Sequence, residues 1–320
     1  MRVRGGRIVI SYVGPPSNID RIIISLLSNS KTMKRLSITL FFITLAAYTF
    51  AQNSILWEIS GNGLSKPSYI MGTLKFIGQR EFYLPKEATE RMTQCQLFAI
   101  EDQVDHHAQS HLNKAVHFPA GKSLKTELSP EDYKKVTDFF AKEFKISAKK
   151  FDKEFARLIP LALSMNMTRM ALGEKVRFYD IELLTLAKKY KLDAYSLEEI
   201  DREAQAIQAF PMKDQETALL HSINNFEQQK KEYHQLEIAF LKGDLDKVFE
   251  YSLHPTENNP VFMDEFYIKR NLEWFPKIEK MVSTKRSFIT VGVAHLEGEK
   301  GLLNLLRQKG YTLTPVAVTH

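Results

Sequence analysis

Ile289-Thr-Val-Gly-Val-Ala-His295, near the end of the 320-residue chain, is an apolar run followed by glycine, two further residues and histidine. Tyr69-Ile-Met-Gly-Thr-Leu-Lys75 has the same plan, with lysine in the last place. Each apolar run predicts a strand, and each glycine predicts a sharp turn at positive φ. The two Gly-x-x units therefore suggest related halves that meet across one cleft.

Helix and strand signals alternate around these units, which is typical of an α/β protein. Strands are expected at 55–59, 67–71, 97–100, 176–180, 191–197, 286–291 and 311–318. Helices are expected at 85–92, 182–190 and 298–307. Gly61-Asn-Gly63 predicts a hairpin between the first two strands.

Longer helical stretches are expected as insertions at about 105–172 and 200–283. In the first, Ser129 and Ser147 are predicted helix caps, and the helix after Ser147 is expected to bend at Pro160. The predicted fold class is α/β (α+β), a mixed β-sheet core from two related halves with large helical insertions.

The first 51 residues have the composition of a leader. Met33-Lys-Arg35 precedes an apolar run and then Thr49-Phe-Ala51, the plan of a secretory signal peptide. An N-terminal membrane anchor is the alternative reading. We expect a spurious upstream extension over 1–32, a signal peptide over 33–51, and one mature domain over 52–320 that is exported to the periplasm or the extracellular space.

The basic charge is concentrated in this leader. Residues 1–51 hold seven basic side chains and one acidic one, and removing them from the 44 basic and 38 acidic residues leaves 37 of each. A neutral body argues against nucleic-acid binding. No later apolar run reaches 18 residues, so we expect no membrane span in the mature chain. Cys95, the single cysteine, excludes an internal disulfide.

Acidic side chains stand at the ends of predicted strands. Glu101, Asp180 and Glu198 lie at or just after such ends, as His295 does. A sheet holds its strand ends rigidly, so these are good places for functional side chains. An imidazole facing carboxylates suits either a divalent metal site or an acid–base pair. The alternative is that the acids cap helices or pair with lysine and arginine.

A second histidine cluster competes as a metal site. It consists of His106, His107, His111 and His117, of which His107 and His111 would share one face of a helix. No HExxH motif is present. Incidental surface histidines are the simpler interpretation.

With both Gly-x-x units and Glu101 in view, the chain resembles the TraB/GumN family. The same broad group includes the Tiki membrane-tethered metalloproteases and, more distantly, ChaN-like and erythromycin-esterase-like proteins. The resemblance covers nearly all of the mature chain, and residues 291–311 carry it more specifically than residues 55–73. Arg270-Asn271 and Leu197-Glu198 also fall where the family has such pairs. Of these residues, Arg270, Asn271 and Glu198, together with Asp180, are the candidate substrate-binding residues.

The resemblance implies two Gly-x-x-His motifs and a glutamate around one divalent metal ion (Mn, Co or Zn) in an exported hydrolase. By position, Gly72 and Gly292 are the motif glycines, and His295 and Glu101 are the metal ligands and catalytic residues. Lys75 replaces the first histidine and is the third catalytic candidate. A lysine of ordinary pKa is a cation without a lone pair, so it repels a metal ion.

Three functions remain open. The first is a metal-dependent hydrolase of the peptidase type, acting on a peptide or small molecule, that tolerates Lys75. The second is a ligand-binding or interaction protein without turnover, in which Lys75 pairs with Glu101 in place of the metal. The third is a metal-free hydrolase that uses His295 as general base with Glu101 as its partner.

Overall fold

The structure is a computed structural model that describes residues 54–102, 106–173, 175–199, 201–252 and 259–319, of which residues 106–109 are described by their backbone alone. The chain forms two compact units, Met1–Gln52 and Asn53–His320, and all described residues belong to the second. The predicted upstream extension and signal peptide lie outside the described residues.

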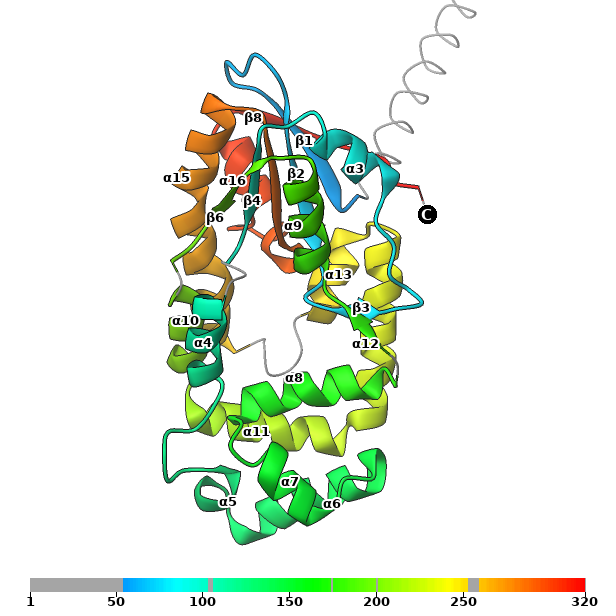
Figure 1. Cartoon of the computed structure of the whole chain (residues 1–320), viewed down its shortest axis with the longest axis vertical. Helices are drawn as coiled ribbons and strands as arrows, with labels where there is room; N and C mark the ends of the chain where they lie inside the picture. The colour runs from blue at the N-terminus through cyan, green and yellow to red at the C-terminus, as the bar shows by residue number, and fades with distance from the viewer. Residues whose placement is uncertain (1–53, 103–105, 174, 200, 253–258, 320) are drawn as a thin grey trace, which may run out of the picture. The chain divides into compact units, whose positions relative to one another are not determined.

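A six-stranded mixed sheet forms the centre of the second unit (Figure 1). The strand order is β6-β4-β7-β2-β1-β8. Every strand is parallel to the others except β1, which pairs antiparallel with β2 and β8 and confirms the predicted hairpin. The strands are β1 (Leu56–Gly61), β2 (Ser68–Thr73), β4 (Leu97–Ile100), β6 (Asp193–Ser196), β7 (Ser287–Gly292) and β8 (Tyr311–Pro315).

Helices cover both faces of this sheet. α3 (Lys86–Met92) contacts β2 and β7, and α9 (Tyr179–Lys189) contacts β4 and β6. α15 (Lys269–Thr284) contacts β7, α16 (Leu302–Gln308) contacts β8, and these two helices contact each other. Right-handed crossovers place the helices on opposite faces, because the chain moves toward β6 in the first half and back toward β8 in the second. The α/β prediction is confirmed.

This topology gathers the carboxyl ends of β2, β4, β6 and β7 at one edge of the sheet. The connections after β2 and β4 cross one face of the sheet, and the connection after β7 crosses the other face. In open α/β sheets, ligands bind in the crevice formed at such a reversal.

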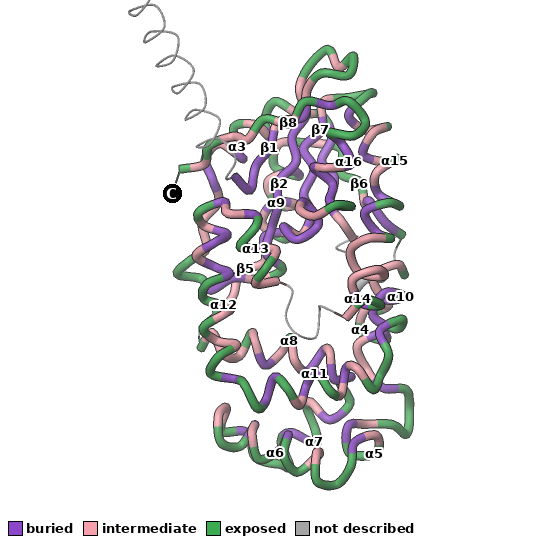
Figure 2. Tube along the Cα trace, turned by 180° about the vertical axis from the view of Figure 1, so that it is seen from behind, coloured by how far each residue is buried: buried purple, intermediate pink, exposed green. Residues whose placement is uncertain are grey.

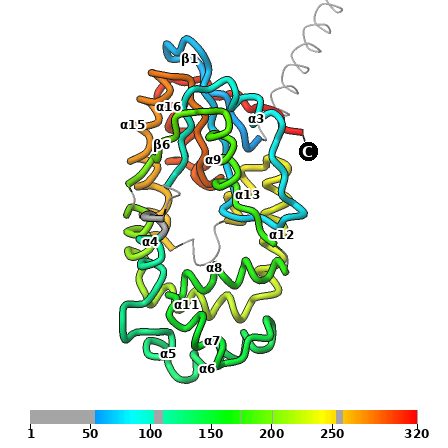
Figure 3. Tube along the Cα trace, in the orientation of Figure 1, coloured from blue at the N-terminus to red at the C-terminus, as the bar shows by residue number. Residues whose placement is uncertain are grey.

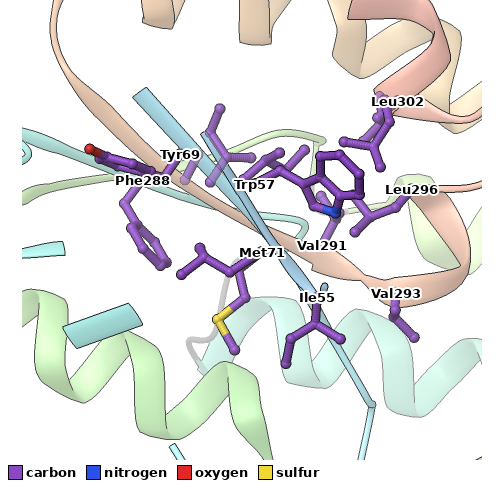
Figure 4. Close-up of a cluster of buried hydrophobic side chains, with 14 of the residues drawn as sticks. Ile55, Trp57, Tyr69, Met71, Phe288, Val291, Val293, Leu296 and Leu302 are labelled. Atoms are coloured by element: carbon purple, nitrogen blue, oxygen red, sulfur yellow. The ribbon is translucent and has the colours of Figure 1, made fainter. Parts of the chain in front are cut away.

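The core of the sheet joins segments that lie far apart in the sequence. Ile55, Met71 and Val291 pack beside the residues that follow β7, among them Val293 and Leu296 (Figure 4). Fully burying one such side chain contributes about 1.5–3 kcal/mol to the free energy of unfolding. Because both faces are covered, the central strands are continuous apolar runs rather than alternating ones.

The helical segment between β4 and α9 shares a second hydrophobic core with residues 207–226 of the later helical segment. This core is centred on residues such as Phe140, Phe151 and Leu163, and buried positions are purple in Figure 2. The predicted bend at Pro160 is wrong. The chain forms two separate helices there, because proline lacks an N–H and takes the first position of the second helix. The elements are α4 (His106–Ala115), α5 (Leu124–Glu127), α6 (Pro130–Phe144), α7 (Ala148–Glu154), α8 (Pro160–Ala171) and β5 (Val176–Arg177). β5 pairs with β3 (Ile77–Gly78), a strand that precedes β4, in a small two-stranded sheet.

A second helical segment runs from β6 to α15 and ends in a π-helical turn, Asp264–Ile268. Its helices are α10 (Arg202–Ala209), α11 (Met212–Asn224), α12 (Phe226–Leu241), α13 (Leu245–Ser252) and α14 (Pro260–Met263). None of the helices in the described ranges is both long and apolar enough to cross a membrane.

Candidate functional site

The two Gly-x-x units are neighbours in the sheet. β2 and β7 pair in parallel, with Gly72 opposite Val291 and Thr73 opposite Gly292. Figure 3 shows the first strands and the last elements of the chain, far apart in sequence, gathered at one end of the unit. The polar residues that end the two units are therefore held at the same edge.

The glycines are needed for space, and the expectation of a positive φ is wrong. Gly292 has φ −52°, and Gly72 is not in the left-handed region either. A Cβ on Gly72 would lie 2.8 Å from Val293 Cγ2 and 2.9 Å from Leu296 Cδ1. A Cβ on Gly292 would lie 3.1 Å from Glu101 Oε1. Each glycine thus lets a neighbouring segment approach the strand closely.

His295 is held in one orientation by an asparagine. It is 4% exposed and lies in the 3-10 turn Val293–His295. The Asn271 amide group donates to the carbonyls of His295 (3.2 Å) and Lys300 (2.9 Å), so Asn271 Oδ1 faces the imidazole and accepts from Nδ1 at 2.7 Å. The ring centroids of Trp274 and Tyr267 lie 4.5 and 5.0 Å from the centroid of the imidazole ring. The proton of the neutral ring is therefore on Nδ1, and Nε2 keeps its lone pair.

The surroundings of His295 favour this neutral form. Burial lowers the pKa of His295 to about 3, and the positive charges of Arg270 and Lys75 add to this, against the opposing charge of Glu101. Nε2 faces Glu101 Oε1 at 3.8 Å. The site thus presents an unprotonated nitrogen beside a carboxylate at neutral pH.

Glu101, directly after β4, is fixed through both oxygens. Oε1 accepts from the Gly292 N–H, and Oε2 accepts from Arg270 Nη2 at 3.2 Å. Burial alone would raise the pKa of Glu101, but the charges of His295, when protonated, and Arg270, together with the Gly292 N–H, lower it. Glu101 is therefore ionised at neutral pH.

Arg270 links Glu101 to a second buried carboxylate. Its guanidinium binds both oxygens of Glu198 at 2.9 Å, and Trp274 Nε1 donates to Glu198 Oε2 at 3.1 Å. Arg270 is 3% exposed and Glu198 4%. Burial raises the pKa of Glu198, against the opposing effect of Arg270. Arg270 and Glu198 were predicted to bind substrate. In the structure they form hydrogen bonds with each other, and Arg270 also donates to Glu101.

Lys75 has a different partner from the one we hypothesised. Its Nζ pairs with Glu203 Oε1 at 3.1 Å. Among the described residues, Lys75 and Glu101 do not form an ion pair with each other. Glu203 is the main cause of a raised pKa for Lys75, to which Asp180 and Glu101 add. The side chain is 49% exposed, so water screens part of this effect. Lys75 is nevertheless an ammonium ion at neutral pH.

Asp180 completes the set of predicted residues. It lies in the first turn of α9, and Thr73 Oγ1 donates to its Oδ1 at 3.4 Å. Burial raises the pKa of Asp180 to about 6, Lys75 opposes this, and the negative charges of Glu101 and Glu203 add to it. Asp180 therefore titrates much closer to neutral pH than an ordinary aspartate does.

Sequence reasoning missed Glu203, Thr73 and Trp274. Glu203 is the one glutamate of α10, a helix that carries no recognisable motif. Trp274 carried a usable signal, because it follows Arg270 by four residues and shares its helix face. The π-helical turn just before α15 is also a feature found often at functional sites.

This donor set does not fit a divalent metal ion. Only His295 Nε2 and Glu101 face each other, and both Glu101 oxygens already accept hydrogen bonds. The described residues include no group of three or more His, Cys, Asp or Glu side chains arranged to hold a metal. Lys75 adds a positive charge where the resemblance would place the third ligand.

The other histidine cluster and the cavities lie elsewhere. His111 pairs with Asp201, and His117 Nδ1 donates to the Asn113 carbonyl at 2.6 Å, while the side chains of His106 and His107 lie outside the described residues. A cavity of about 1120 Å³ between α4, α10 and α11, and another of about 280 Å³ beside α12, include none of the residues around His295.

The fold is a doubly wound α/β sheet with paired Gly-x-x units and a glutamate at its carboxyl edge. The chain matches the TraB/PrgY/gumN family over residues 55–315 and belongs to that family. Searches of curated proteins and of solved structures found no significant match.

Proposed function

We propose that this protein is an exported, metal-independent member of the family that binds a ligand at the carboxyl edge of its sheet without metal-dependent turnover. One observation carries the proposal: Lys75, in the place of the first motif histidine, is a charged ammonium group paired with Glu203 at 3.1 Å. Two unit charges of the same sign about 4 Å apart repel by about 4 kcal/mol at an effective dielectric constant of 20. A divalent ion would meet a larger repulsion.

Metal analysis of the purified mature protein tests this proposal. We expect wild-type protein dialysed against Mn, Co or Zn to hold far less than one ion per chain. Lys75→His restores the third ligand and should bring bound metal toward one per chain, whereas Lys75→Arg is the control that should bind none. Stoichiometric metal in the wild type that is lost in His295→Ala would overturn the proposal and support a metal-dependent hydrolase.

Metal-free hydrolysis is a second candidate, favoured by the held tautomer of His295. Asn271 keeps the proton on Nδ1, so Nε2 can accept a proton from water, and the carboxylate of Glu101 would stabilise the imidazolium that forms. Hydrolysis of an unfolded protein such as casein should then survive chelation and fail in His295→Ala. Asn271→Leu, which releases the tautomer, should also lose activity. Absence of any hydrolysis by the wild type would eliminate this candidate.

Export is the remaining part of the proposal and rests on the signal-peptide pattern of residues 33–51. Cell fractionation should recover the protein from the periplasm or the medium, with an N-terminus near Gln52. A cytoplasmic protein that begins at Met1 or Met33 would contradict it.

A further inference from the structure

The cavity of about 1120 Å³ between α4, α10 and α11 has the size of a ligand-binding site. Pockets that hold a small molecule measure about 300–1,000 Å³. Three segments that are distant in the sequence contribute to its walls: residues within 110–119, Arg157 with Ile159, and residues within 207–215. Lys75 and His295 are not among the lining residues, so a ligand of this cavity is separate from one at the carboxyl edge of the sheet.

A short antiparallel bridge joins the first wall of the cavity to the second. The Phe118 N–H donates to the Arg157 carbonyl at 2.8 Å, and the Ile159 N–H donates to the Val116 carbonyl at 3.0 Å. The Arg157 side chain also donates from Nη2 to the Phe118 carbonyl at 2.9 Å. This hydrogen bond uses one of the five N–H groups of the guanidinium, and the others form no hydrogen bond with a described residue. Arg157 is therefore held in place with donors to spare, which lowers the entropy cost of binding an anion.

The charge around this cavity has one sign. Lys114 and Arg157 line the cavity and are exposed, and neither forms an ion pair within the described part of the chain. No described aspartate or glutamate lines the cavity, although acidic and basic residues are equal in number over residues 52–320. Uncharged hydrogen-bonding groups complete the polar side of the lining, namely Ser110, Asn113 and Gln208, all of them exposed. An anion is the ligand whose charge is complementary to such a surface.

Much of the remaining lining is apolar. Met212, at the start of α11, is 36% exposed, and Pro119 is exposed as well. Behind them the wall is made of buried apolar side chains such as Ile207 and Phe210. Gln215 is the buried polar residue of this wall, and both ends of its amide group already bind backbone groups, so it does not compete for a ligand. An apolar chain that covers Met212 and Pro119 removes their surface from water.

From these features we propose that the cavity is a binding site for an amphiphilic carboxylate, of which a fatty acid of medium chain length is the simplest example. The carboxylate accepts hydrogen bonds from the Arg157 guanidinium and the Lys114 ammonium group, and both are charge-assisted. The hydrocarbon chain packs against Met212 and Pro119. The site therefore recognises a negative charge and an apolar chain together.

Calorimetric titration of the full mature protein with octanoate tests the proposal. Octyltrimethylammonium reverses the charge on the same chain, and acetate keeps the charge but removes the chain. We expect octanoate to bind with a Kd below about 1 mM and each of the other two to bind at least tenfold more weakly. Equal affinity for octyltrimethylammonium would reveal a merely apolar cavity, and equal affinity for acetate a simple anion site. Either result, or no binding of octanoate, would overturn the proposal.

Substitutions in the lining locate the binding. Arg157→Met and Lys114→Met each remove one cation and should weaken octanoate at least fivefold. Lys149→Met, which changes an exposed lysine of α7 outside the cavity, is the matched control and should change nothing. Met212→Glu places a negative charge on the apolar wall and should weaken octanoate at least tenfold.

The two cation variants also protect the test against a folding defect. Arg157→Met loses the hydrogen bond to the Phe118 carbonyl, whereas Lys114 forms no hydrogen bond with a described residue, so Lys114→Met should fold as the wild type does. Unchanged octanoate affinity in folded Lys114→Met would contradict the site. Lys75→Met should bind octanoate as the wild type does. Loss of binding in that variant would place the carboxylate at the carboxyl edge of the sheet instead, and would overturn the assignment to this cavity.

Discussion

The two Gly-x-x units have the same backbone plan on adjacent strands, and their surroundings give them opposite chemistry. His295, at the end of the second, is 4% exposed and held by Asn271 of α15 in a neutral form. Lys75, at the end of the first, is half exposed and held by Glu203 of α10 as a cation. The sheet fixes where the two side chains lie, and the helices packed beyond its edge decide which charge each one carries.

The free energy of unfolding should depend far more on the charged groups around the second Gly-x-x unit than on those around the first. Arg270→Met leaves the carboxylates of Glu198 and Glu101 buried without their cation, and we expect it to lower the free energy of unfolding by about 3–5 kcal/mol. Urea unfolding measures this. Lys269→Met, which removes the surface ion pairs of Lys269 with Asp264 and Glu265 at the start of the same helix, is the control and should cost less than about 1 kcal/mol. Similar costs for the two variants would contradict the account.

Asp180, which feels the charge of Lys75, should give a pH-dependent effect. Its pKa is raised in the folded state, so it favours folding below about pH 4 and loses this contribution as pH rises through about 6. Asp180→Asn should therefore be more stable than the wild type by about 2 kcal/mol at pH 7.5, with no difference at pH 4. Thermal unfolding at both pH values measures this, and a variant less stable at pH 7.5 would contradict the raised pKa.

The two glycines provide a direct comparison of the units. Gly72→Ala places a methyl group against the backbone-proximal atoms of Val293, so it should cost about 1–3 kcal/mol. Gly292→Ala places its methyl group 3.1 Å from Glu101 Oε1 and 3.4 Å from His295 Cδ2, both side-chain atoms, and should cost less than about 1 kcal/mol. Urea unfolding of both variants is the measurement, and the reverse order would show that Glu101 is packed more rigidly than Val293.

These comparisons also show what the sequence could and could not predict. The strands and the Gly-x-x units follow from apolar runs and glycines, which are local signals, and the strand ends follow from the parallel topology. The partner of Lys75 is a different matter. Glu203 lies 128 positions away in a helical insertion with no motif, so only the three-dimensional packing of α10 reveals the pair. The reason for the glycines was likewise tertiary, because it is the approach of Val293 and Glu101 that excludes a Cβ.

The smallest effect is expected at Lys75 itself. Lys75→Met removes an ion pair in which the lysine is half exposed, so it should change the free energy of unfolding by about 1 kcal/mol or less. Urea unfolding beside Arg270→Met measures the contrast. A cost as large as that of Arg270→Met would mean that both units are equally dependent on buried charge pairs.

The central claim is that Lys75 is a cation where the resemblance places a metal ligand. The titration of the Lys75 side-chain amine, followed by NMR on protein with 15N-labelled lysine and assigned with Lys75→Arg, tests it most directly. We predict an ammonium signal that persists through neutral pH and titrates above the ordinary lysine value of about 10.4. A Lys75 amine that loses its proton below about pH 8 would be free to act as a ligand or base, and would contradict the claim.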